Sequence, residues 1–335
     1  MQKFKLYLVK GEFSEQKVLG RQSKDYLFQE FEDYEYIIVD DLNEVDGAAF
    51  PRAVISLDMP LVRAKDLDRT LVSMQKSAVS RVVFGGEGSP FGVWLDKGKD
   101  TYFVYDDAFL KLGGAKNDNM VYNTMRRRII DHLLDGGVRI LGDDFHIDST
   151  VTVESGATLK SPLTLSGDTF VERGAYVENS IVTDSTLSKG AMMTSSHITA
   201  SQVGENSSVG PFARLRGANI GANCRIGDFV EVKGSTLGDG VKCAHLSYIG
   251  DADVGEKTNV GCGTVFCNYD GKNKHHTSVG KKVFIGANVN LVAPITIGDN
   301  AFLAAGTTVT KSVEDSGFVI GRVRAEKLTK SKQEG

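Results

Sequence analysis

The chain has 335 residues and a formal net charge of −4. This charge gives no support for nucleic-acid binding, and the sequence shows neither a signal peptide nor an apolar run of membrane length. We therefore expect a cytoplasmic protein that binds neither nucleic acid nor membrane, with room for two domains and a large core.

Residues 1–115 alternate short apolar runs with polar or helical stretches, which is typical of a small α/β domain. The expected strands are Lys5–Val9, Tyr36–Val39, Ala53–Ser56, Arg81–Phe84 and Thr101–Val104.

A helical pattern follows from about Asn119 to Leu134, and Gly136-Gly137 ends it, so residues 116–140 are expected to form a linker helix. The apolar residues that can share one face of this helix are Met125, Ile129, Ile130, Leu133 and Leu134. We interpret Arg126–Arg128 as a solvated face of the helix rather than an anion site.

From Ile147 to Val309 an apolar residue returns every five or six positions. This hexapeptide period predicts short strands wound into a parallel β-helix, with three strands per coil and the repeated aliphatic inside. Gly, Ala, Asn and Asp between the repeats suit tight corners, and these glycines would break a helix. The β-helical domain is expected over residues 141–325, followed by a flexible tail at 326–335.

The four cysteines all lie within the repeats, and they are Cys224, Cys243, Cys262 and Cys267. Cys243 occupies an inward position, and the others lack the spacing of zinc ligands. We therefore expect reduced structural thiols rather than disulfides or metal ligands.

Three repeats complete one coil, so Arg216 and Lys233, each one residue after a repeat aliphatic, should stack on neighbouring coils. Like charges about 4.8 Å apart repel each other, and a phosphate monoester held between them would reverse the interaction. The alternative is a pair of splayed, solvated cations with Glu231 as partner. The residues themselves leave both interpretations open.

His245 and Tyr248 are expected to point away from the bore, within a coil of the two cations. With an ordinary pKa near 6.5, an imidazole is a natural general base at neutral pH. A lone surface histidine more often has no catalytic role, so this assignment depends on the neighbouring cations.

The one break in the period lies between Phe266 and Val279 and predicts a loop extruded from the coil. Such a loop can reach a neighbouring subunit and complete its site. A decorated turn at Asp270-Gly271 explains the break equally well. His245, His275 and His276 could suggest three zinc ligands as in the γ-class carbonic anhydrases, but the adjacent pair has the wrong spacing for that family, so no metal site is expected in the repeats.

Seven strings in the repeat region resemble one family of enzymes. They are Gly210–Arg216 (GPFARLR), Asp228–Lys233 (DFVEVK), His245–Asp251 (HLSYIGD), Cys267–Gly271 (CNYDG), Leu291–Pro294 (LVAP), Ala304–Thr310 (AAGTTVT) and Ile320–Arg322 (IGR). They are similar to the acetyltransferase domain of the bifunctional N-acetylglucosamine-1-phosphate uridyltransferase/glucosamine-1-phosphate acetyltransferases. The resemblance implies a left-handed β-helix, a homotrimer with acetyl-CoA between subunits, and acetyl transfer to the 2-amine of glucosamine-1-phosphate.

The resemblance also implies roles for single residues, with His245 as the catalytic base. The implied sugar-phosphate positions are Arg216, Lys233, Tyr248, Asn259 and Lys274. The implied acetyl-CoA positions are Cys262, Asn268, Tyr269, Ala287, Ala305 and Arg322. Cys262 and Ala287 differ from the commonest family residues, but backbone groups can make both contacts.

The amino-terminal third resembles the family's uridyltransferase domain less well. Where that domain has a Gly-rich loop around the nucleotide phosphates, Lys10–Gln16 has one glycine and two carboxylates. Asp58 corresponds to the family's magnesium-holding Asp and is a possible remnant of a metal site. We expect a shortened, degenerate domain that has lost uridyl transfer, with magnesium needed only if that activity survives.

Three alternatives stay open on the sequence. The chain could acetylate another aminosugar phosphate or a sugar nucleotide, it could still be bifunctional, or it could bind a sugar nucleotide as a non-catalytic regulator.

Overall fold

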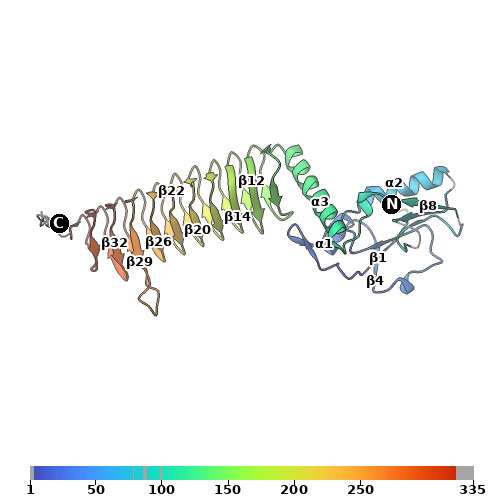
Figure 1. Cartoon of the computed structure of the whole chain (residues 1–335), viewed down its shortest axis with the longest axis horizontal. Helices are drawn as coiled ribbons and strands as arrows, with labels where there is room; N and C mark the ends of the chain where they lie inside the picture. Colours follow the sequence, from blue (N-terminus) through green and yellow to red (C-terminus); the bar gives the residue numbers. More distant parts are fainter. Residues whose placement is uncertain (1–3, 78, 86–88, 99, 322–335) are drawn as a thin grey trace, which may run out of the picture. The chain divides into compact units, whose positions relative to one another are not determined.

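The computed structural model describes residues 4–77, 79–85, 89–98 and 100–321 (Figure 1). They form two compact units. The first extends to His132 and includes His146–Thr150, and the second takes Leu133–Phe145 and everything described from Val151 onward. No helix within the described ranges is long and apolar enough to cross a membrane.

The first unit is built on a six-stranded sheet with the order β4-β1-β5-β7-β6-β8. Its strands are β1 (Lys5–Val9), β4 (Tyr36–Val39), β5 (Arg52–Ser56), β6 (Arg81–Phe84), β7 (Gly92–Trp94) and β8 (Thr101–Val104). The pairs are parallel except that β7 runs antiparallel to β5 and β6. The five predicted strands are confirmed. Strand β7 was not predicted, because three residues are too few to show a period.

Helices α1 (Ser23–Glu30) and α2 (Ala64–Ser77) bury their apolar sides in the main core of this unit. Leu67 and Leu71, one helical turn apart, are fully buried there. The short elements of the unit are β2 (Lys17–Val18), β3 (Arg21–Gln22), η1 (Leu42–Glu44) and η2 (Asp107–Phe109).

Helix α3 (Ala115–Asp135) begins about four residues earlier than its apolar pattern indicated. Met125 is buried as predicted, but Leu134 is 48% exposed. The prediction for Leu134 was wrong because nine residues at 100° each place it on the opposite face of the helix from Met125. The solvated face was also wrong for Arg128, since its Nη1 donates to the Leu61 carbonyl at 2.9 Å and burial lowers its pKa.

The second unit is a left-handed parallel β-helix of about 14 turns. Each coil contributes one strand to each of three faces, which we call A, B and C in chain order. Face A contains β9 (Arg139–Leu141), the first parts of β12 (Thr158–Ser166) and β14 (Tyr176–Thr183), β16 (Met192–Thr194), β19 (Ser208–Val209), β22 (Arg225–Asp228), β25 (Lys242–His245), β28 (Asn259–Val260), β31 (Phe284–Ile285), β34 (Phe302–Leu303) and β36 (Phe318–Val319). Strand β10 (Phe145–Ile147) follows β9.

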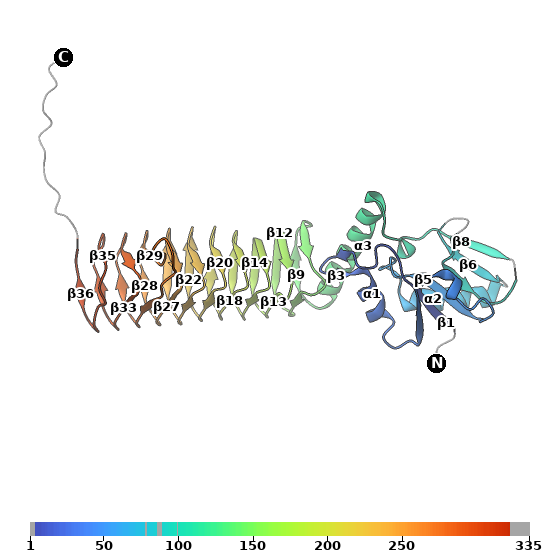
Figure 2. The ribbon, with the colours of Figure 1, turned by 90° about the horizontal axis from the view of Figure 1, so that it is seen from below.

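Face B contains the second parts of β12 and β14, then β17 (His197–Thr199), β20 (Arg214–Arg216), β23 (Glu231–Lys233), β26 (Tyr248–Gly250), β29 (Val265–Cys267), β32 (Asn290–Val292) and β35 (Thr308–Val309). Face C contains β11 (Thr152–Val153), β13 (Phe170–Val171), β15 (Thr186–Leu187), β18 (Gln202–Val203), β21 (Asn219–Ile220), β24 (Thr236–Leu237), β27 (Ala252–Val254), β30 (Thr277–Val279) and β33 (Ile295–Ile297). Figure 2 shows members of face C in one row.

The predicted hexapeptide period is confirmed by the filling of the bore. On face B, Leu215, Val232 and Ile249 stand in register on successive coils, and each is fully buried. Outward side chains alternate with them along each strand. Function on this unit therefore depends on outward side chains, corners and the inserted loop.

Candidate active site

One candidate feature is a column of residues where face A turns into face B. Its members each follow an inward face A residue by two positions, and they are Asp228, His245, Cys262, Ala287 and Ala305. We call this set the base column. The register makes it continuous from coil to coil, so His245 lies next to a row of small residues.

His245 is the titratable histidine of the base column, and its side chain is 54% exposed. Its Nδ1 lies 3.8 Å from Oδ2 of Asp228 on the preceding coil. The prediction that His245 points away from the bore is confirmed. A carboxylate on the Nδ1 side leaves Nε2 available to a substrate. Asp228 was not assigned a role from the sequence, although its spacing of one coil from His245 carried that signal.

A second feature lies at the other end of face B, where Arg216 and Lys233 stand in register on neighbouring coils as predicted. Arg216 pairs with Glu231, the partner expected for a solvated cation. Lys233 Nζ lies 3.8 Å from Oδ1 of Asp251. The Nε of Arg216 is buried and has no hydrogen-bond partner among the described residues, so the guanidinium retains donor capacity.

The loop between β29 and β30 brings a third cation to this place. Lys233 lowers the pKa of Lys274 by hydrogen bonding and by repulsion, while Asp251 opposes the shift. The two ammonium groups are therefore close neighbours. We call Arg216, Lys233 and Lys274 the cation cluster. Its three cations face the carboxylates of Glu231 and Asp251, which leaves an excess of one positive charge.

Tyr248 and Asn268 border the cation cluster. Asn268 is buried, and its Nδ2 donates to Oδ2 of Asp251 at 2.5 Å and lies 3.4 Å from the Tyr248 hydroxyl. These contacts anchor the start of the loop on the coil that follows the coil of Lys233. The structure thus gathers four predicted sugar-phosphate residues and one predicted acetyl-CoA residue in a single region.

The extruded loop is confirmed, since β29 ends at Cys267 and β30 begins at Thr277 (Figure 1). Its tip is also the turn that the sequence allowed: Asn273 N–H, the His275 ring and Lys272 N–H hold the pKa of Asp270 well below its usual range.

The other loop side chains point to different partners. His276 Nε2 lies 3.1 Å from Oδ2 of Asp253, while the Tyr269 side chain is 62% exposed. The Tyr269 hydroxyl donates to the Gly271 carbonyl at 2.8 Å, so residues 268–276 form an ordered arm that presents an exposed aromatic ring.

The base column and the cation cluster start from opposite ends of face B. From Asp228 to Lys233 the chain crosses face B, a path on the order of 15 Å at about 3.3 Å per residue. His245 stands on the coil next to that of Lys233, so the predicted separation of one coil holds along the axis, while the two side chains start from opposite ends of face B. Asn259 lies on face A, opposite Lys242 and Phe284 in register. Arg322 and the tail at 326–335 lie outside the described residues.

The thiols differ sharply in exposure. Cys224 and Cys243 are buried, Cys267 is half-buried and Cys262 is exposed. Burial raises the pKa of Cys243 to about 12, so this thiol is an inert part of the bore, as its inward position predicted. The described part of the chain holds no group of three His, Cys, Asp or Glu residues able to bind a metal ion.

Asp58 of the first unit is fully buried, and its Oδ2 has no hydrogen-bond partner among the described residues. Its Oδ1 accepts the Phe13 N–H at 3.1 Å, and its Oδ2 lies 3.5 Å from Lys111 Nζ. Burial raises the pKa of Asp58, and Lys111 opposes this. The carboxylate fills the space beneath Gly11, where an added Cβ would lie 2.1 Å from it. Through its hydrogen bond to Phe13, the carboxylate contacts the segment Lys10–Gln16, which the resemblance aligns with a phosphate-binding loop.

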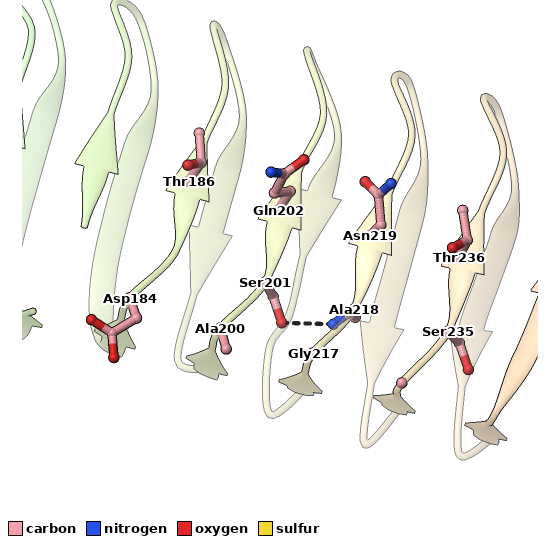
Figure 3. A pocket seen from close by; sticks show the side chains of 11 residues that line it. Asp184, Thr186, Ala200, Ser201, Gln202, Gly217, Ala218, Asn219, Ser235 and Thr236 are labelled. Carbon is pink, nitrogen blue, oxygen red and sulfur yellow. Dashed lines mark hydrogen bonds between the residues drawn. The ribbon is translucent and has the colours of Figure 1, made fainter. Parts of the chain in front are cut away.

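A shallow hollow of about 660 Å³ lies on the corner between faces B and C (Figure 3). Its lining includes Gly217 and Gly234, which directly follow Arg216 and Lys233. Ser201 Oγ accepts the Ala218 N–H at 3.0 Å across two coils. The hollow is thus a polar surface next to two members of the cation cluster.

A family model and two curated relatives agree with this architecture. A family model described as bacterial transferase hexapeptide (six repeats) matches residues 276–311. The bifunctional protein GlmU of Clostridium acetobutylicum is 45% identical over 207 residues, which make up 61% of this chain and 45% of that protein. GlmU of Oleidesulfovibrio alaskensis is 41% identical over 212 residues, or 62% of this chain and 46% of that protein. The solved UDP-N-acetylglucosamine acyltransferase of Arabidopsis is 16% identical with a TM-score of 0.30, over 55% of this chain and 70% of that one.

The chain therefore spans less than half the length of the curated relatives it matches. The second unit carries the hexapeptide repeat of bacterial transferases, and over about three fifths of its length the chain is similar to the GlmU proteins.

Proposed function

We propose that this protein transfers the acetyl group of acetyl-CoA to the 2-amine of glucosamine-1-phosphate. The observation that carries the proposal is the cation cluster, in which Arg216 and Lys233 stand in register on neighbouring coils and Lys274 adds a third positive charge. Mutual repulsion costs free energy, and a bound phosphate dianion would convert it into attraction. The seven strings of the resemblance supply the identity of the sugar and of the acyl donor.

The active site is assembled from two copies of the chain. His245 and the cation cluster lie at opposite ends of face B, and we propose that they belong to two different sites of the assembly. In a closed ring the base column of one copy meets the cation cluster of the next. We propose a homotrimer, in keeping with the resemblance.

Exposed apolar side chains beside the base column support this assembly. Phe212, Phe229 and Leu246 are 57%, 60% and 59% exposed and occupy the same corner of successive coils. All three have positive φ, which large apolar residues rarely adopt. Phe229 and Leu246 directly follow Asp228 and His245, so a neighbouring copy that covers these two side chains also closes the site.

The chemistry requires a free amine, because an ammonium group has no lone pair with which to attack. His245 Nε2 takes a proton from the amine as nitrogen attacks the thioester carbonyl carbon. The carbon–sulfur bond then breaks, and the imidazolium returns the proton to the departing thiolate, giving CoA. Backbone N–H groups of the coil are the candidate donors to the tetrahedral oxyanion. No acyl-enzyme is needed, so the cysteines have no nucleophilic role.

Acetyl-CoA would lie along the base column beyond His245. Cys262, Ala287 and Ala305 have short side chains, which let an extended pantetheine arm approach the backbone of each coil. Cys262 and Ala287 differ from the commonest family residues, but both side chains are small and do not block this path.

A larger acceptor is a second candidate, and the hollow of Figure 3 favours it. The hollow begins at the residues that follow Arg216 and Lys233, on the side of the phosphate away from His245. A group esterified to that phosphate would enter it. The exposed side chains of Gln202 and Asn219 would offer hydrogen bonds to such a group.

We propose further that the first unit does not transfer uridylyl groups. A nucleoside triphosphate needs converging N–H groups and cations. Here the Phe13 N–H is bonded to Asp58, and the loop carries Glu12 and Glu15. Asp58 itself is paired with Lys111, so it is poorly placed to hold magnesium.

Thiol release with acetyl-CoA tests the acetyl transfer across three acceptors: glucosamine-1-phosphate, glucosamine, and a nucleotide-linked glucosamine. The proposal expects turnover with glucosamine-1-phosphate and little with glucosamine, which lacks the phosphate. Turnover confined to the nucleotide-linked sugar would favour the larger acceptor, and no turnover with any of them would refute acetyl transfer to aminosugars.

Pyrophosphate release tests the first unit separately. With UTP, magnesium and N-acetylglucosamine-1-phosphate, we expect none above background. Sustained release that Asp58→Ala abolishes would show that the chain is a bifunctional enzyme.

A further inference from the structure

A small cavity lies on the first unit, on the side of the sheet opposite to α1 and α2. Residues alternate between the two sides along each strand, so Leu6 and Leu8 of β1 pack in the main core with the helices, whereas Tyr7 packs on the other side. The cavity has a volume of about 220 Å³. Its apolar walls and one cationic side chain come from Leu42, Val45, Val54, Pro90, Trp94 and Arg52. The proposed acetyl transfer does not involve these residues.

Arg52 is the cationic side chain of this cavity, and it stands opposite Trp94 at the start of β5. Its guanidinium carbon lies 4.6 Å from the centroid of the Phe50 ring and 5.1 Å from that of Trp94. Its Nη1 donates to the carbonyl oxygens of Gly47 at 2.8 Å and of Ala49 at 3.3 Å. These contacts hold the guanidinium at the wall of the cavity in one orientation.

The charge of Arg52 is only partly balanced. Asp46 is the carboxylate whose charge reaches Arg52, but its Oδ2 lies 4.0 Å from Lys5 Nζ and is shared with that lysine. Burial lowers the pKa of Arg52, and Tyr7 and Asp46 oppose this shift. Lys5 and Arg52 stand opposite each other on β1 and β5, so two cations share one carboxylate and leave an excess of one positive charge. The cavity therefore favours an anion.

Two buried hydrogen-bond donors beside the cavity are unused. They are the Nε of Arg52 and the hydroxyl of Tyr7, and neither has a partner among the described residues. Tyr7 is 1% exposed, and its register partner on β5 is Val54, which lines the cavity. A buried donor without an acceptor costs free energy. Because Tyr7 is near enough to affect the pKa of Arg52, a group with two acceptor oxygens can serve both donors.

We propose that this cavity binds a small carboxylate, with its two oxygens at Arg52 and Tyr7 and its apolar body against Trp94. The two oxygens of a carboxylate lie in one plane and match the planar fork of a guanidinium. A phosphate ester suits the site less well, because the apolar walls would leave its other oxygens without donors. The volume is below the roughly 300–1,000 Å³ of pockets for drug-sized ligands, so a nucleotide is too large.

Tryptophan fluorescence reports on the cavity directly, because the sequence has one tryptophan and Trp94 lines the cavity. Benzoate is the probe, since it joins a carboxylate to a flat apolar ring. We expect benzoate to change the fluorescence of the full-length protein saturably, with a dissociation constant on the order of 1 mM or tighter that calorimetry reproduces. Benzamide has the shape without the charge, and inorganic phosphate has the charge without the ring. Both should bind at least about tenfold more weakly than benzoate.

Two variants test the two donors separately. Arg52→Lys keeps the charge but loses Nε and the planar fork, so it should weaken benzoate binding by about ten- to a hundredfold. Tyr7→Phe removes only the hydroxyl and should weaken binding by about tenfold. Because that hydroxyl has no partner among the described residues, the melting temperature of Tyr7→Phe should equal or exceed that of the wild type. Weaker binding without lower stability is a result that a purely structural role would not give.

Arg81→Lys is the matched control. Arg81 stands opposite Trp94 on β6, as Arg52 does on β5, but its Nε donates to Oγ1 of Thr101. This variant should bind benzoate as the wild type does.

Fluorescence that changes linearly without saturation would overturn the inference, and so would wild-type benzoate affinity in Arg52→Lys and Tyr7→Phe. Benzamide or phosphate that binds as tightly as benzoate would also overturn it, since the carboxylate and the apolar body would not both be recognised. Each of these outcomes leaves the proposed acetyl transfer intact, because they concern the first unit.

Discussion

At the scale of single residues, the neighbouring charge of Lys233 lowers the pKa of Lys274. A lysine with a lowered pKa loses its charge at lower pH than an ordinary lysine, so phosphate binding should weaken as pH rises through that pKa. We expect kcat/KM for glucosamine-1-phosphate to fall along an alkaline limb that begins below the ordinary lysine range. Lys233→Gln should shift this limb to higher pH. If the limb does not shift, the charge of Lys233 is not what lowers the pKa of Lys274.

His245 is the titratable side chain of the base column that the mechanism needs. His245→Ala should lower the turnover of acetyl transfer by about 10²- to 10⁴-fold, the usual contribution of a general base. CoA binding measured by calorimetry should change little, because the imidazole acts on the amine. Near-wild-type turnover in an assembled His245→Ala protein would remove this residue from the mechanism.

Cysteine reactivity provides an independent probe of the acyl-donor groove. Cys262 is exposed, whereas Cys243 is buried and its pKa is raised to about 12. Iodoacetamide at neutral pH should therefore label Cys262 quickly and Cys243 only on unfolding. Mass spectrometry should show that CoA slows labelling of Cys262, while glucosamine-1-phosphate does not. Labelling unaffected by CoA would place the donor away from the base column.

Coil stacking at the element scale leaves no room for a side chain at certain positions. A Cβ on Gly227 would lie 2.0 Å from the Ala244 carbonyl oxygen of the next coil. Gly227→Ala should therefore destabilise the β-helix by about 3 kcal/mol or more. Gly217 is the matched control, because a Cβ there meets nothing within 4 Å and only its φ of +58° opposes alanine.

Gly217→Ala should cost roughly 1–2 kcal/mol, the price of a left-handed backbone for alanine. Thermal unfolding followed by circular dichroism measures both variants. Equal losses would mean that coil spacing adapts to the added methyl group.

The element scale also explains the wrong prediction for Leu134. This residue is apolar and lies in the helix, but it is not on the face of the helix that is buried.

Assembly of the site from two copies gives a prediction at the scale of the whole molecule. His245→Ala and Lys233→Ala proteins are mixed, dissociated and reassembled into rings. Each intact site then needs the base column of a Lys233→Ala copy next to the cation cluster of a His245→Ala copy. Random reassembly should restore about a quarter of the wild-type activity. No recovery after verified subunit exchange would place both residues in the same copy's site.

The sequence by itself determined the repeating architecture, because one aliphatic side chain must enter the bore in every strand. It also placed Arg216 above Lys233, since their 17-residue spacing is one coil of three strands. The five predicted strands of the first unit followed from local composition, whereas three-residue β7 was invisible to any period.

Only the tertiary structure decided how the site residues are grouped. The period tells which side chains face outward but not at which corner of the coil they stand, so it could not show that face B separates His245 from Lys233. The return of Lys274 to Lys233 depends on the path of an irregular loop, which follows no period. Asp58 looked like a metal ligand in the sequence, and burial against Phe13 and Lys111 is what engages its carboxylate.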